Sequence, residues 1–175
     1  MSYRYTTVDL AILAVVAAVF GAVFTFAWTP YYAVKAIGGK FAAVLLTYGI
    51  WYMAAPLAAT LIRKPGAALL GETLAGLVES LLPQVGGFSC FIYGLGQGIF
   101  SEIAYAVFRY KKYGLLQAVL AGALPALPSL VLDILLWSSV YPPPVFAVLF
   151  VLAAASGAIY GALSYLIASK IAVRK

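Results

Sequence analysis

The chain has 175 residues, of which 65% are hydrophobic and only 9% are charged, and its mean hydropathy is +1.05. Because soluble domains carry about 25% charged residues, this composition excludes a surface that faces water and predicts an integral membrane protein. The sequence has no histidine and a single cysteine, which excludes histidine-based catalysis, histidine–metal sites and an internal disulfide framework. We explain the net charge of +6 by membrane topology and expect no binding to nucleic acid.

Six apolar segments are long enough to cross a bilayer, which takes roughly 17–25 residues. Short stretches rich in glycine, proline or charge separate them and are typical of turns. The predicted spans are 8–29, 41–62, 66–82, 88–108, 114–139 and 145–169. They predict an all-α bundle of six transmembrane helices, which forms a single transmembrane substrate-binding domain over residues 1–175. The longest connection, 29–40, is expected to be a loop.

The basic residues predict the orientation of these spans. If both termini lie on one side of the membrane, the opposite side holds only Lys35 and Lys40. The side of the termini then holds Arg4, Arg63, Lys64, Arg109, Lys111, Lys112, Lys170, Arg174 and Lys175. Since cytoplasmic loops are enriched in Lys and Arg, we expect a multi-pass protein of the plasma membrane with both termini in the cytoplasm.

The acidic residues give the strongest functional signal. Asp9 stands at the start of the first span, and the other acids, Glu72, Glu79, Glu102 and Asp133, all fall inside predicted spans. Ionisable groups at this depth are costly and usually face a cavity or a partner. With a rise of about 1.5 Å per residue, Glu79 and Asp133 are expected in the outer half of the membrane, and Glu72 and Glu102 deeper.

An outer layer of predicted site residues combines acids, aromatic rings and an amide, which together suit an organic cation with a flat ring. Its members are Tyr48, Trp51, Glu79, Tyr93, Gln97, Asp133 and Trp137. The amide and hydroxyls could bind ring nitrogens or an exocyclic amine, although Tyr48 and Trp51 could equally be packing residues. Glu72 and Glu102 form a second layer that could contribute to the site, or could instead join helices through hydrogen bonds as protonated acids.

A stripe of small residues on the first span, Ala14, Ala18 and Ala22, allows close helix contact in a membrane. The contact could be internal or with another subunit, and the abundance of alanine makes chance a real alternative. Three aromatic residues near the first loop are interpreted as anchors at the membrane interface rather than as ligand contacts, although that loop could also form a lid: Trp28, Tyr31 and Tyr32.

The sequence offers no catalytic machinery. GGKF at 38–41 lacks the spacing and the Ser or Thr of a Walker A motif, and no nucleophile–base pair or metal-ligand cluster can be assembled. We therefore expect neither an enzyme nor a cofactor. One hypothesis is a solute-capturing subunit that depends on another polypeptide for energy, and the alternative is a gradient-driven carrier whose carboxylates relay protons. The lack of an evident repeat favours the first, because many secondary transporters are built from repeats.

Three stretches of the chain resemble the YkoE family, whose members are substrate-binding S components of energy-coupling factor (ECF) vitamin transporters. They are YGIWYMAAPLAATLIRKPGAALLGETLAGLVESLL at 48–82, GLGQGIFSEI at 94–103 and LDILLW at 132–137. The similarity extends over nearly the whole chain, and the turn IRKPGAAL at 62–69, with the two-glutamate helix after it, is its most specific part.

The resemblance implies a six-helix membrane protein with both ends in the cytoplasm, in agreement with the charge pattern. It also implies high-affinity capture of thiamine or its hydroxymethylpyrimidine portion from outside, followed by association with a transmembrane coupling subunit and two ATPases. Small residues on the first helix of such proteins commonly contact the coupling subunit, which fits the alanine stripe. Thiamine suits the outer layer because its thiazolium is permanently positive and its aminopyrimidine can stack and form hydrogen bonds.

Overall fold

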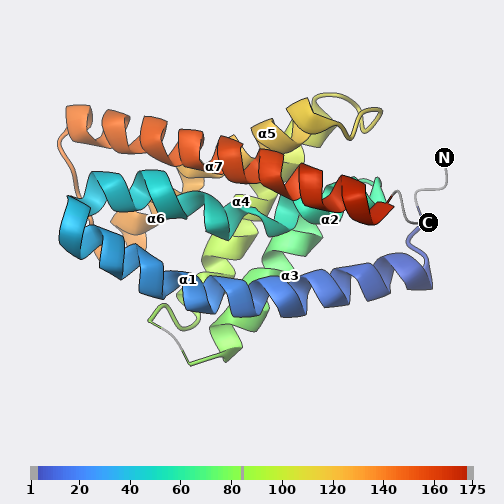
Figure 1. Cartoon of the computed structure of the whole chain (residues 1–175), viewed down its shortest axis with the longest axis horizontal. Coiled ribbons are helices and arrows are strands. Elements are labelled where there is room, and N and C mark those ends of the chain that lie inside the picture. Colours follow the sequence, from blue (N-terminus) through green and yellow to red (C-terminus); the bar gives the residue numbers. More distant parts are fainter. Residues whose placement is uncertain (1–3, 84, 173–175) are drawn as a thin grey trace.

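The computed structural model describes residues 4–83 and 85–172, so Arg174 and Lys175 of the topology prediction lie outside the described residues. Within these ranges the chain forms helices and no strand, which confirms the all-α prediction. The elements are α1 (Thr7–Thr47), η1, a 3-10 helix (Tyr48–Tyr52), α2 (Ala54–Ile62), α3 (Ala67–Leu81), α4 (Ser89–Ala106), α5 (Leu115–Ala123), α6 (Ala126–Trp137) and α7 (Pro143–Ala172). The start of α1 and the end of α7 lie at the same end of the bundle (Figure 1).

The segment 29–40 is helical, so the prediction of a long loop there was wrong. Helix α1 continues through Pro30 and breaks only at Gly39, whose φ of 75° and ψ of −179° are not helical. The chain reverses at this glycine and returns through η1 into α2 (Figure 1). Proline removes one backbone hydrogen bond, which neighbouring groups can compensate in a membrane helix. The positive φ at Gly39, in contrast, is a conformation that glycine adopts without steric cost.

The predicted spans correspond to helical segments. Among the described residues, three segments are long and apolar enough to cross a membrane by length and composition: Thr7–Ile62, Leu115–Trp137 and Pro143–Ala172. The first of these contains the reversal at Gly39. Helix α3 has 15 residues and is therefore about 22 Å long, which is shorter than the hydrocarbon core of a bilayer at about 30 Å. The six-span topology stays a prediction.

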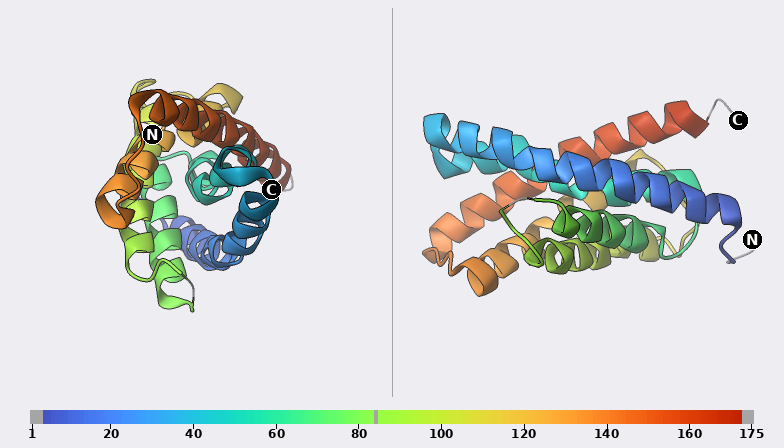
Figure 2. Two further views of the ribbon diagram at one scale, coloured as in Figure 1. Left: turned by 90° about the vertical axis from the view of Figure 1, so that its left-hand side faces the viewer. Right: turned by 90° about the horizontal axis from the view of Figure 1, so that it is seen from below.

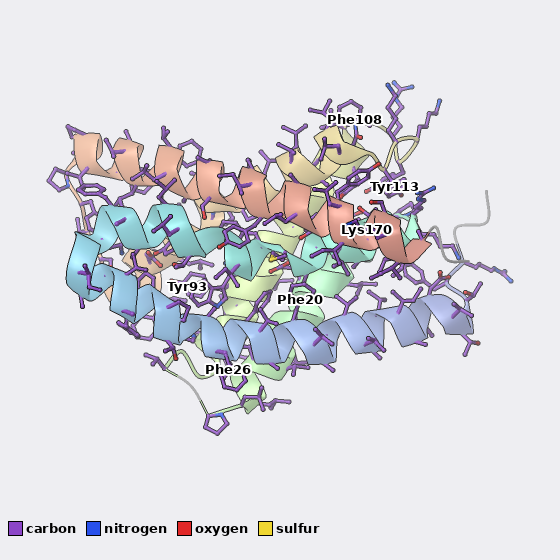
Figure 3. The ribbon with its side chains drawn as sticks, viewed as in Figure 1. Phe20, Phe26, Tyr93, Phe108, Tyr113 and Lys170 are labelled. Carbon is purple, nitrogen blue, oxygen red and sulfur yellow. The ribbon has the colours of Figure 1, made fainter. Side chains whose placement is uncertain are left out.

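Helix α2 lies inside the bundle, with α1, α3 and α7 around it (Figure 2). All but one of its residues are buried, and half of these are alanine. Helix α1 has two distinct faces: Phe20 is 8% exposed and points toward the other helices, whereas Phe26 is 74% exposed and points away (Figure 3). An apolar outer face next to a buried inner face is what lipid surroundings require, because lipid tails are as apolar as the helix side chains.

Glycines allow α3 and α4 to pack with their backbones in close contact. A Cβ atom added to Gly76 would lie 2.7 Å from the carbonyl oxygen of Cys90, and one added to Gly94 would lie 2.9 Å from the carbonyl oxygen of Glu72. Small residues at such interfaces are the main device for packing helices in membranes. This contact places the Glu79 end of α3 against the Cys90 end of α4, and so forms one wall of the cavity described next.

Candidate functional site

A cavity of about 260 Å³ lies toward the end of the bundle that carries the Gly39 turn and the α6–α7 connection. Side chains from α1, η1, α3, α4 and α6 line it. All seven residues of the predicted outer layer are among them: Tyr48, Trp51, Glu79, Tyr93, Gln97, Asp133 and Trp137. Figure 3 shows one of these, Tyr93, among the helices rather than on the outer face. The structure thus brings together residues that lie up to 89 positions apart in the sequence.

Glu79 forms the acidic part of the α3 wall. It is 2% exposed, and its Oε1 atom accepts hydrogen bonds from the indole N–H groups of Trp28, at 3.0 Å, and Trp51, at 3.2 Å. Both indoles therefore have a fixed orientation at the cavity, with the carboxylate between them. A buried acid held by hydrogen-bond donors is a suitable counter-ion for a cationic guest, since little water is present to screen it.

Asp133 forms the acidic part of the α6 wall and has a different environment. Its Oδ2 atom accepts a hydrogen bond from the Tyr48 hydroxyl at 2.8 Å, and its Oδ1 atom accepts one from the Tyr93 hydroxyl at 2.7 Å. The Nζ atom of Lys40 lies 3.5 Å from Oδ2 and forms a salt bridge. Three elements, η1, α4 and the segment after Gly39, are therefore joined at this one carboxylate.

The remaining two predicted residues occupy the same wall as Asp133. The Gln97 amide donates to the Ser129 hydroxyl at 3.0 Å, and that hydroxyl donates to the Pro125 carbonyl oxygen at 2.8 Å. These two linked hydrogen bonds orient the Gln97 amide, on α4, toward the cavity. Trp137, the last residue of α6, lines the cavity and is 45% exposed, which places it at the rim.

The interpretation of the α1 aromatic residues as membrane anchors was wrong, because they line the cavity. The Trp28 ring lies 5.3 Å from the Trp51 ring and stacks 5.9 Å from the Tyr32 ring, and Tyr31, which is 7% exposed, lies 6.0 Å from Tyr48. Tyr32 itself is 45% exposed, at the rim. Their spacing of three and four residues places them on one helix face, a signal that becomes visible once Pro30 is accepted inside the helix.

The second layer, Glu72 and Glu102, stands apart from the cavity, whose described lining includes neither residue. Glu102 accepts hydrogen bonds from the N–H groups of Gly66, at 2.6 Å, and Leu69, at 3.0 Å, at the start of α3. Glu72, which is fully buried, accepts one from the N–H of Ala55 at 2.7 Å, at the start of α2. Each acid thus binds N–H groups that a helix start leaves without internal partners. Of the two roles considered for Glu72 and Glu102, the structure shows the second, in which each joins two helices through hydrogen bonds.

Asp9 ties the start of α1 to the turn before α3, at the opposite end of the bundle from the cavity. Its Oδ2 atom lies 2.6 Å from Lys64 Nζ, and its carboxylate forms a capping box with Thr6. Nearby, the Tyr5 hydroxyl donates to the Pro65 carbonyl oxygen at 2.9 Å. Burial, with the neighbouring carboxylates, raises the pKa of Tyr5 to about 12, so this hydroxyl stays a donor throughout the physiological pH range.

The alanine stripe lies on the outer face of α1. Ala14 and Ala18 are exposed and Ala22 is half-buried, so the stripe is not used for a tight contact inside the chain. This leaves contact with another subunit, or chance, as the interpretations of the stripe.

Three comparisons place the chain among known proteins. Residues 8–128 match a family model described as "ABC-type cobalt transport system, permease component". A curated protein of Bacillus subtilis (strain 168), named "Putative HMP/thiamine permease protein YkoE", is 36% identical over 117 residues, which cover 66% of this chain and 59% of that protein's length. A solved structure described as the "Crystal structure of an S-component of ECF transporter" superposes with a TM-score of 0.90 at 29% identity and covers 98% of this chain and 87% of that chain.

Proposed function

We propose that the chain, which belongs to the family of ABC-type cobalt transport system permease components and is an S component of the ECF type, captures thiamine or hydroxymethylpyrimidine from outside the cell with high affinity. Its relatives are transporter subunits rather than enzymes. The observation that carries the proposal is the cavity in which Glu79 and Asp133 stand among aromatic rings. The name of the B. subtilis relative supports the same pair of ligands.

The chemistry of the cavity suits the two parts of thiamine. Glu79 would pair with the thiazolium cation, and Asp133 would accept a hydrogen bond from the exocyclic amine of the pyrimidine. Rings of the cavity would stack on the ligand, and Gln97 would bind a ring nitrogen. The rings are Trp28, Tyr31, Tyr48, Trp51, Tyr93 and Trp137. The volume of about 260 Å³ lies just below the usual range for pockets that bind drug-sized molecules, which suits a ligand as small as a vitamin.

An organic cargo fits the cavity better than the cobalt ion in the family's description. Within residues 4–83 and 85–172 there is no group of three or more His, Cys, Asp or Glu side chains that could hold a metal ion. The carboxylate of Asp133 is occupied by two hydroxyl donors and Lys40. The many ring faces around it would contribute nothing to a hydrated divalent ion, which prefers several oxygen or nitrogen ligands.

Transport would require further subunits, and the bundle has a suitable surface for one. We place the six spans in the plasma membrane with both termini in the cytoplasm, because the described basic turns lie at the end of the bundle opposite the cavity. The stripe of Ala14, Ala18 and Ala22 on the outer face of α1 would then contact a transmembrane coupling subunit that is driven by two ATPases. The proposal does not require the carboxylates to relay protons, as a gradient-driven carrier would.

The intrinsic fluorescence of the protein tests ligand capture directly, since each of its three tryptophans lines the cavity: Trp28, Trp51 and Trp137. Purified protein should show a saturable fluorescence change with thiamine and with hydroxymethylpyrimidine, without ATP or an ion gradient. A ligand at about 100 times its Kd should also stabilise the fold by about 2.7 kcal/mol, which a melting curve would show. In the melting curve, riboflavin serves as a control for non-specific binding of a flat ring. The proposal would be contradicted if neither ligand gave a saturable fluorescence change and neither stabilised the protein.

A further inference from the structure

A lysine stands inside a cavity that should accept a cation. Lys40 follows Gly39 directly, at the break inside α1 where the chain reverses, and its side chain is 22% exposed. Its Nζ atom lies 3.5 Å from Oδ2 of Asp133 and 5.0 Å from the centre of the Tyr141 ring. All three residues line the cavity. The ammonium group is therefore part of the site, and it lies where a cationic guest would otherwise meet Asp133.

Lys40 changes what Asp133 can recognise. With the ammonium group at salt-bridge distance and two tyrosine hydroxyls donating to its oxygens, the carboxylate already has a counter-charge. A compensated carboxylate still accepts a hydrogen bond from a neutral amine or hydroxyl, but it attracts a second cation only weakly. The donors to Glu79 described above are neutral indole N–H groups, which leave the formal charge of that carboxylate in place.

We propose that Lys40 sets the charge selectivity of the cavity: it reserves Asp133 for a neutral aminopyrimidine and leaves Glu79 as the counter-ion for a fixed cation. This inference rests on the proposed function and extends it. It explains how one cavity can accept both a neutral pyrimidine and the cation that contains the same ring. Without Lys40, the negative charge of Asp133 would add to that of Glu79, and the cavity would favour the cation strongly over the neutral ring.

Lys35 provides a matched control. It is a second lysine of the cavity rim, where its Nζ atom lies 5.8 Å and 6.0 Å from the centres of the Tyr31 and Tyr32 rings, and it is exposed. Both described salt bridges lie elsewhere, at Lys40–Asp133 and Lys64–Asp9. Replacing Lys35 therefore changes the total charge near the cavity as much as replacing Lys40, but leaves the counter-charge of Asp133 intact.

The test is the ratio of Kd for hydroxymethylpyrimidine to Kd for thiamine, measured by tryptophan fluorescence on the full chain at pH 7.5. Lys40→Met should raise this ratio roughly tenfold or more, because removal of a nearby like charge favours only the cation. Lys35→Met should change it less than about threefold, since exposed charges are screened by solvent. Lys40→Arg should keep the wild-type ratio, and Lys40→Met combined with Asp133→Asn should restore it, because the pair is then removed as a whole.

The outcomes separate this inference from the function on which it rests. Binding of both ligands with an unchanged or lower ratio in Lys40→Met overturns the role of Lys40, and so does an equal change in Lys35→Met. If wild-type protein binds neither ligand, the proposed function fails and the selectivity role fails with it. The melting curve of each unliganded variant establishes that it is folded, and Lys40→Gln replaces Lys40→Met if the latter is not.

Discussion

Replacement of Glu79 by glutamine is the sharpest test of how the cavity binds a cation. The substitution keeps the size of the side chain and an oxygen that can accept from the indoles of Trp28 and Trp51, which lie 3.0 Å and 3.2 Å from Oε1. It removes the negative charge. At 2% exposure the site is poorly screened by solvent, so the loss of charge should be felt almost fully by a permanently charged ligand.

The expected magnitude follows from the distance and the surroundings. Opposite unit charges about 4 Å apart attract by about 4 kcal/mol at an effective dielectric constant near 20. Since the amide oxygen of glutamine keeps part of this attraction, we expect a loss of about half of it, about 2 kcal/mol, which is about 30-fold in the Kd of thiamine. Hydroxymethylpyrimidine would lose at most one hydrogen bond, about 1 kcal/mol or about fivefold.

The assay is a fluorescence titration of wild-type protein, Glu79→Gln and the control variant Asp9→Asn with both ligands. Asp9 lies at the opposite end of the bundle and pairs with Lys64, so its replacement should leave both Kd values unchanged. The ratio of the two Kd values should shift about sixfold in Glu79→Gln, which is the quotient of the two losses above. Equal losses for both ligands would show that Glu79 does not act as the counter-ion of the thiazolium.

Three further predictions concern the fold and the cavity wall. Gly94→Leu should lower stability by about 1–3 kcal/mol in a denaturation assay, because its Cβ would lie 2.9 Å from a backbone oxygen of α3, whereas Ala18→Leu on the outer face should have little effect; equal effects would contradict the packing described. Glu102→Gln should cost about 1 kcal/mol of stability through the weakened start of α3 and leave ligand affinity unchanged, and a loss of affinity would restore Glu102 to the site. Cys90, the only cysteine and 4% exposed in the cavity wall, should react with N-ethylmaleimide more slowly when thiamine is bound, and an unchanged rate would place the ligand elsewhere.

Depth and side-chain chemistry were sufficient to select seven of the residues that line the cavity. Glu79 and Asp133 could be found because acids are rare in lipid-facing sequence and because a helix rises by a constant amount per residue. Whether these residues bind the ligand stays a prediction. The roles of Glu72 and Glu102 depend on which helix start lies opposite each acid, and a tertiary contact of this kind leaves no pattern along the chain.

The errors at the first turn have a single physical origin. Pro30 suggests a helix end in a soluble protein, but α1 continues past it for nine residues to Gly39. With a loop assumed there, Trp28, Tyr31 and Tyr32 had no common face and could not be assigned to the cavity. A glycine pair at 38–39 was the stronger stop signal, since glycine is the residue that adopts a positive φ readily.

The acid-capped starts of α2 and α3 bear on how the protein is made. Helix α3 is short and contains two carboxylates, and the N–H groups at its start are bound by Glu102 of α4. Alone in lipid, either helix of this pair would expose costly polar groups. During biogenesis α3 and α4 should therefore leave the translocon together as a hairpin rather than one helix at a time. In this hairpin Glu102 of α4 accepts hydrogen bonds from the N–H groups that the start of α3 would otherwise expose.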